Sequence, residues 1–103
     1  MSLRQDIEER LGELPGLERR RSRWEPGEAY FVGDREIAHF HGDGRMDIRL
    51  TKERIRELKS EGGLDPRVQT RGASAHWATL RLDGPRDLPL ALALVEEAIR
   101  ANG

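Results

Sequence analysis

One stretch of the sequence, residues 38–50, constrains the fold more than any other because it has the pattern of a β-hairpin with two chemically opposite faces. A three-residue turn at 42–44 pairs Phe40 with Met46 and places every apolar side chain on one face. A register shift of one residue would bury the charged side chains instead, so the register is well specified. The opposite face collects the polar residues His39, His41, Arg45, Asp47 and Arg49.

The composition is that of one small folded domain spanning residues 1–103. Charged residues make up 36% of the chain, yet the apolar residues occur in periodic blocks, which predicts a folded rather than a disordered chain. The absence of cysteine excludes disulfides, Cys-ligated zinc, iron–sulfur clusters and thiol nucleophiles. We expect a cytoplasmic protein without a membrane partner, because no apolar run could cross a bilayer and no secretory leader is present.

The periodicity predicts an α+β fold in which helices pack on one face of a single antiparallel sheet, in the order α-β(3-4)-α-β(1-2)-α. Helices are expected from Ser2 to about residue 14, from Thr51 to Ser60 and from Asp87 to about Ala101, each N-capped by its first residue. Strands are expected at 17–24, 29–32, 36–41, 45–50, near Val68 and at 76–82. An antiparallel sheet of this kind can leave its other face open to solvent.

The polar face of the hairpin is the candidate site. His39 lies across from Asp47, and a carboxylate in that position orients an imidazole and raises its basicity, as a general base requires. No nucleophile accompanies the pair. An ordinary cross-strand polar pair is the alternative, and a solvated face predicts that replacing both histidines changes stability little. We name His39, His41 and Asp47 as candidate catalytic residues, and Arg49, Trp77 and Arg81 as candidate ligand-binding residues.

His39 and His41 stand two residues apart on a strand, a spacing that lets two imidazoles bind one metal ion. Alternation places His76 on the apolar face, so only two dependable ligands remain, and we predict no metal site. Trp77 on a polar face indicates a ligand, a partner or a dimer interface. The alternative is that Trp77 packs under the loop at 65–75 and has a structural role.

Residues 18–24 carry four arginines and Trp24, a composition found in nucleic-acid-binding patches. Alternation along a strand sends these arginines to both faces, and glutamates flank them. The net charge of −1 gives the whole chain no attraction to nucleic acid. We therefore expect no nucleic-acid partner and interpret the segment as a charged edge strand.

The motif REIAHFHGDG at 35–44, followed by DIRL at 47–50, resembles a family of small bacterial proteins of unknown function named for fungal luciferase. The resemblance extends over about residues 27–100 and includes Trp77. More distantly, the order of elements resembles the MmcQ/YjbR-like proteins, which implies a secretion-chaperone-like fold. The fungal enzyme oxygenates a hydroxylated pyrone without metal or organic cofactor. The resemblance therefore implies no cofactor, His39 or His41 as a base oriented by Asp47, and Arg49 or Arg81 holding an oxyanion.

Three functions remain open from the sequence. The first is binding of a small anionic or aromatic ligand on the open sheet face, with Trp77 stacking and His39, His41, Arg49 and Arg81 supplying polar contacts. The second is a protein–protein interaction or homodimerisation module. The third is a cofactor-free oxygenase or another proton-transfer enzyme, which also requires a cleft that excludes water. A concave pocket around Trp77 would favour the first, and a flat apolar surface the second.

Overall fold

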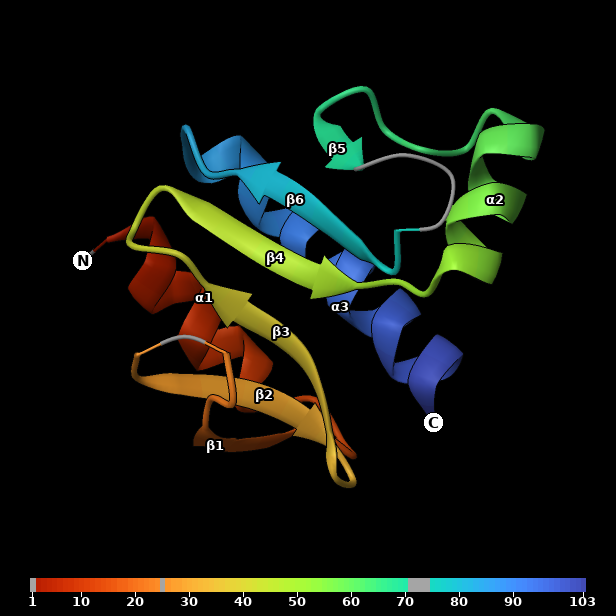
Figure 1. The fold of residues 1–103 in the computed structure, drawn as a ribbon. Helices are drawn as coiled ribbons and strands as arrows, with labels where there is room; N and C mark the ends of the chain where they lie inside the picture. Colours follow the sequence, from red (N-terminus) through yellow and green to blue (C-terminus); the bar gives the residue numbers. More distant parts are fainter. Residues whose placement is uncertain (1, 25, 71–74) are drawn as a thin grey trace.

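Six antiparallel strands form one sheet in the order β1-β2-β3-β4-β6-β5 (Figure 1), so the predicted α+β class with a single antiparallel sheet is confirmed. The computed structural model describes residues 2–24, 26–70 and 75–103. The strands are β1 (Glu18–Arg21), β2 (Glu28–Val32), β3 (Arg35–Phe40), β4 (Arg45–Arg49), β5 (Val68–Thr70) and β6 (Trp77–Arg81). The helices are α1 (Leu3–Leu11), α2 (Lys52–Glu61), the short 3-10 helix η1 (Pro85–Asp87) and α3 (Leu88–Asn102).

Helices α1 and α3 cover one face of the sheet, while α2 lies where the chain leaves β4 (Figure 1). Ser2 caps α1 as predicted, because its hydroxyl accepts from the backbone N–H of Gln5 and the Gln5 side chain accepts in return. Thr51 likewise caps α2 by accepting from the N–H of Arg54. Among the described residues, no helix is long and apolar enough to cross a membrane.

The prediction that the Asp87 side chain caps the last helix is wrong. Asp87 already has helical backbone angles, because η1 precedes α3, and its carboxylate points back along the chain. It accepts hydrogen bonds from the N–H groups of Asp83 and Gly84 at 2.8 and 3.1 Å, and from Arg67 at 2.8 Å. A capping side chain normally leaves an extended residue and reaches forward to the next turn.

The hairpin has the predicted register. Phe40 pairs with Met46, Ala38 with Ile48 and His39 with Asp47. The N–H of His41 donates to the carbonyl of Arg45 at 2.8 Å and closes the turn at 42–44. Under α1 and α3, the apolar face forms the core, whose strand residues include Tyr30, Ile37, Ala38, Phe40, Met46, Ile48, Ala78 and Leu80.

A β-bulge between β2 and β3 determines which face Glu36 occupies. Tyr30 pairs with Ala38 but Phe31 pairs with Glu36, so β3 contains one extra residue at Ile37. Ile37 and Ala38 both belong to the core cluster, and Glu36 is therefore turned to the polar face. Strict alternation back from Ala38 would have directed this carboxylate into the core.

Candidate functional site

The imidazole of His39 lies between two carboxylates on the polar face of the sheet. Its Nδ1 is 3.0 Å from Oε2 of Glu36, and its Nε2 is 3.1 Å from Oδ2 of Asp47. The other carboxylate oxygen of Asp47 accepts a hydrogen bond from the hydroxyl of Thr79 at 2.8 Å. Strands β3, β4 and β6 thus contribute to one hydrogen-bonded chain that runs from Glu36 to Thr79.

The segment after β1 crosses the polar face and covers the buried end of this chain. The hydroxyl of Ser22 donates to Oε2 of Glu36 at 2.9 Å, and the N–H of Arg23 donates to Oε1 at 2.7 Å. Glu36 and His39 are consequently only 4% and 6% exposed. The expectation of an open, solvated face is wrong at His39, because strand alternation gives no information about a loop that folds over the sheet.

Two carboxylates around one imidazole favour its charged form. Burial acts to lower the pKa of His39, but the hydrogen bonds and negative charges of Asp47 and Glu36 outweigh it and raise the pKa above its ordinary value of 6.5. For Asp47, burial acts to raise the pKa, and the hydrogen bonds from His39 and Thr79 outweigh that effect and lower it. Only an imidazolium has an N–H on both ring nitrogens. The ring can therefore donate to both carboxylates at once only in its charged form.

A cavity of about 470 Å³ lies over this chain. Trp77 forms one wall, with its ring centroid 5.0 Å from that of His39. Trp24, whose surface is 69% exposed, lines the same cavity. The other lining residues are His41, Arg45, Asp47, Ala75, His76 and Thr79. The cavity therefore combines aromatic walls with a hydrogen-bonded polar floor.

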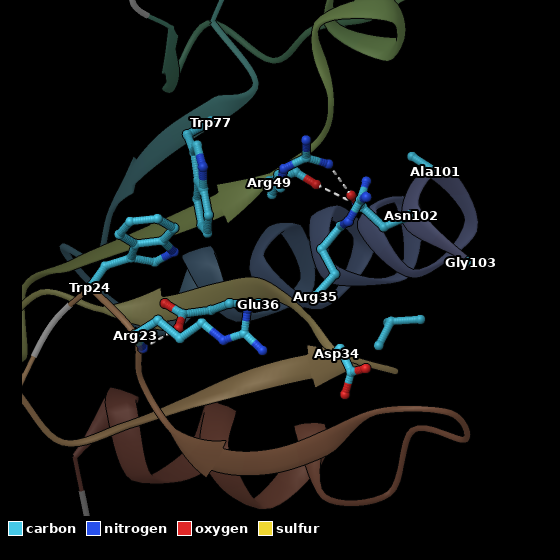
Figure 2. Close-up of a pocket in the computed structure, with 11 residues that line it drawn as sticks. Arg23, Trp24, Asp34, Arg35, Glu36, Arg49, Trp77, Ala101, Asn102 and Gly103 are labelled. Atoms are coloured by element: carbon cyan, nitrogen blue, oxygen red, sulfur yellow. Dashed lines mark hydrogen bonds between the residues drawn. The ribbon is translucent and has the colours of Figure 1, made fainter.

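The structure brings together four of the six residues named from the sequence, namely His39, His41, Asp47 and Trp77. Arg49 lies instead in an adjoining depression that shares Trp77 with the cavity (Figure 2). Arg81 lines a third hollow and is ion-paired with Asp83 at 3.7 Å. The expected loop over Trp77 includes residues 71–74, which lie outside the described residues.

The prediction that His76 faces the apolar side is wrong. His76 precedes the first residue of β6, so the alternation of the strand does not extend to it, and its ring lines the cavity. Its Nδ1 accepts from the N–H of Lys52 at 3.1 Å. Within the described ranges, no three His, Asp or Glu side chains are placed to hold a metal ion.

Sequence reasoning missed Glu36 and Trp24. Simple alternation misplaces Glu36 because it takes no account of the bulge. The interpretation of residues 18–24 as an edge strand does not predict that Trp24, which follows β1, lines a cavity. Arg45 was recognised on the polar face but not as a site residue. Arg45 lines the cavity, while its Nε is itself buried and has no hydrogen-bond partner in the described part of the chain.

The model of the Luciferase domain family matches residues 34–98. The match spans β3 to most of α3 and includes Glu36, His39, Asp47 and Trp77. The covering segment at 22–24 lies outside it. No curated protein and no solved structure matches the chain.

Proposed function

The chain belongs to the Luciferase domain family, and we propose that it binds a small aromatic ligand in the cavity over His39. The observation that carries the proposal is the juxtaposition of two tryptophan side chains with a fixed imidazole at one concave place. A volume of about 470 Å³ is within the range of small-molecule sites. Stacking of an aromatic ring on an indole contributes about 0.5–1.5 kcal/mol beyond the burial of its area.

The hydrogen bonds of His39 support a binding role because they hold the ring in one orientation before a ligand arrives. Both ring nitrogens are bonded to carboxylates, and Trp77 packs beside the ring. Preorganised polar groups lose little conformational freedom on binding.

Concavity and polarity favour a small ligand over the alternative of a dimer interface. A stable interface between copies requires an extended patch whose buried core is more apolar than the rest of the surface. The floor of the cavity instead carries Asp47, Thr79 and His39. The exposed arginines of the edge strand β1 also oppose edge-to-edge pairing of two copies.

Proton transfer is the second candidate function, favoured by the proximity of His39, Asp47 and His41 to one cavity. Both ring nitrogens of His39 are hydrogen-bonded to carboxylates, so this residue is better suited to positioning a substrate than to accepting a proton from it. His41, at the exposed rim, is the better candidate for a general base. In this second function, Asp47 would act through His39 rather than on the substrate.

The chain has two tryptophans, and both line the cavity, so their indole N–H resonances report directly on binding. We expect planar aromatic fragments to shift both resonances saturably in ¹H–¹⁵N spectra, and saturated ring analogues of equal size to shift them far less. Trp24→Ala should weaken binding with little loss of stability, since the side chain is largely exposed. Arg10→Gln, on the opposite side of the sheet, is the control. Undiminished binding by Trp24→Ala would refute this site.

A further inference from the structure

A second depression, of about 740 Å³, adjoins the cavity and contains three arginines (Figure 2). Arg23 reaches it from the covering segment, Arg35 from the start of β3 and Arg49 from the end of β4. Trp24 and Trp77 line both this depression and the cavity over His39. The two hollows therefore share an aromatic wall.

The three guanidinium groups have no carboxylate partner among the residues that the structure describes. Arg49 contacts the side-chain oxygen of Asn102, and Arg35 is exposed. By contrast, arginines such as Arg54 are paired, here through a two-pronged contact with Glu97 at 3.1 Å. Three unpaired cations at one concave place leave a local excess of positive charge on a chain whose net charge is −1.

The two acidic residues of this depression do not neutralise the arginines. The oxygens of Glu36 already accept from Ser22, Arg23 N–H and His39. Asp34 is 95% exposed and lies 3.7 Å from Arg20 on β1. Burial and then the neighbouring charge of Arg35 lower the pKa of Arg49, and the smaller effect of the Glu53 carboxylate acts in the opposite direction.

We infer that this depression binds the acidic group, a carboxylate or a phosphate, of the ligand whose ring lies on the tryptophans. The inference rests on the proposed function and narrows its ligand class to aromatic acids. Guanidinium groups bind carboxylate and phosphate oxygens in a planar, two-pronged geometry. A ring held between Trp24 and Trp77 places its substituent beside the depression, because these residues border both hollows.

Matched ligands test the inference. Cinnamate and cinnamamide have the same planar frame and differ in charge, and phenyl phosphate tests the second acidic group. From indole shifts we expect the better of the two acids to bind about tenfold or more tightly than cinnamamide, since a hydrogen bond between charged groups stabilises more than a neutral one. Arg35→Gln and Arg49→Gln should each remove most of this preference, and Arg10→Gln should retain it. Equal affinity of acid and amide, or a preference that survives both substitutions, would overturn the inference.

The two proposals fail in different ways. Equal binding of acid and amide contradicts only the acid-binding depression, whereas no binding of either contradicts the proposed function and this inference together.

Quenching of tryptophan fluorescence provides a second test, which needs no aromatic ligand and is made on a variant of the exposed Arg35. We expect Arg35→Gln to reduce quenching by iodide and to leave quenching by neutral acrylamide unchanged. Unchanged iodide quenching would contradict the excess of positive charge.

Discussion

Replacing His39 by alanine removes the one cation between two carboxylates. In the variant, Glu36 keeps its bonds from Ser22 and from the Arg23 N–H, and Asp47 keeps its bond from Thr79. Both carboxylates nevertheless lose a charged partner, and in the native structure their side chains are only 1% and 18% exposed. The variant therefore holds two carboxylates in a poorly solvated place without the imidazolium that separated them.

The expected cost of this substitution is about 3 kcal/mol of unfolding free energy. Removal of one partner from a buried ion pair costs about 3–5 kcal/mol, and the lower end applies because Asp47 is partly solvated. A domain of this size loses roughly 4–8 °C in melting temperature per kcal/mol, so we expect a fall on the order of 15 °C. Such a fall differs from the prediction made from the sequence, which is that replacing the histidines changes stability little.

Urea denaturation followed by circular dichroism measures this difference, and His41→Ala is the matched control. His41 precedes the turn on the same face but is exposed, so its replacement should change stability by less than about 0.5 kcal/mol. A loss below 1 kcal/mol for His39→Ala, with the slope of the transition unchanged, would refute the reasoning. Equal losses in the two variants would also contradict it.

Three further results are expected from the same network and from the turn before α3. Because the pKa of His39 is raised in the folded state, its contribution to stability is complete below the ordinary value of 6.5 and disappears as pH rises through the folded value. The stability difference between the native chain and His39→Gln should therefore shrink with rising pH, and a difference that grows would contradict the assignment. Thr79→Val should cost about 1 kcal/mol and raise the lowered pKa of Asp47, which ¹³C NMR of the carboxyl measures. Asp87→Ala should cost about 2–4 kcal/mol in urea denaturation, since three donors lose a buried acceptor; a cost under 0.5 kcal/mol would show that water replaces the carboxylate.

The sequence predicts the hairpin well because two independent signals coincide there. The glycine-flanked turn at 42–44 and the alternation on both sides of it allow only one register that buries Phe40 with Met46. The same reasoning correctly places His39 opposite Asp47. Local patterns of this kind depend on neighbours in the chain, which the sequence displays directly.

The completed site depends on two features that local patterns do not contain. The bulge at Ile37 turns Glu36 to the polar face, although simple alternation directs it into the core. The bonds from Ser22 and Arg23 to Glu36 join segments 13 or more residues apart and convert a solvated face into a buried network. A buried carboxylate and an exposed Trp24 were therefore recognisable as parts of the site only from the structure.

Nitrogen NMR of the histidine side chains tests most directly the charged imidazole on which the proposed site depends. The chain has three histidines, so His41→Ala helps to assign the signals. At neutral pH we expect both ring nitrogens of His39 to carry protons, with two similar imidazolium shifts, and we expect Asp47→Asn to lower the pKa at which one proton is lost. A bare ring nitrogen on His39 at neutral pH, or a pKa below the ordinary value of 6.5, would contradict the account.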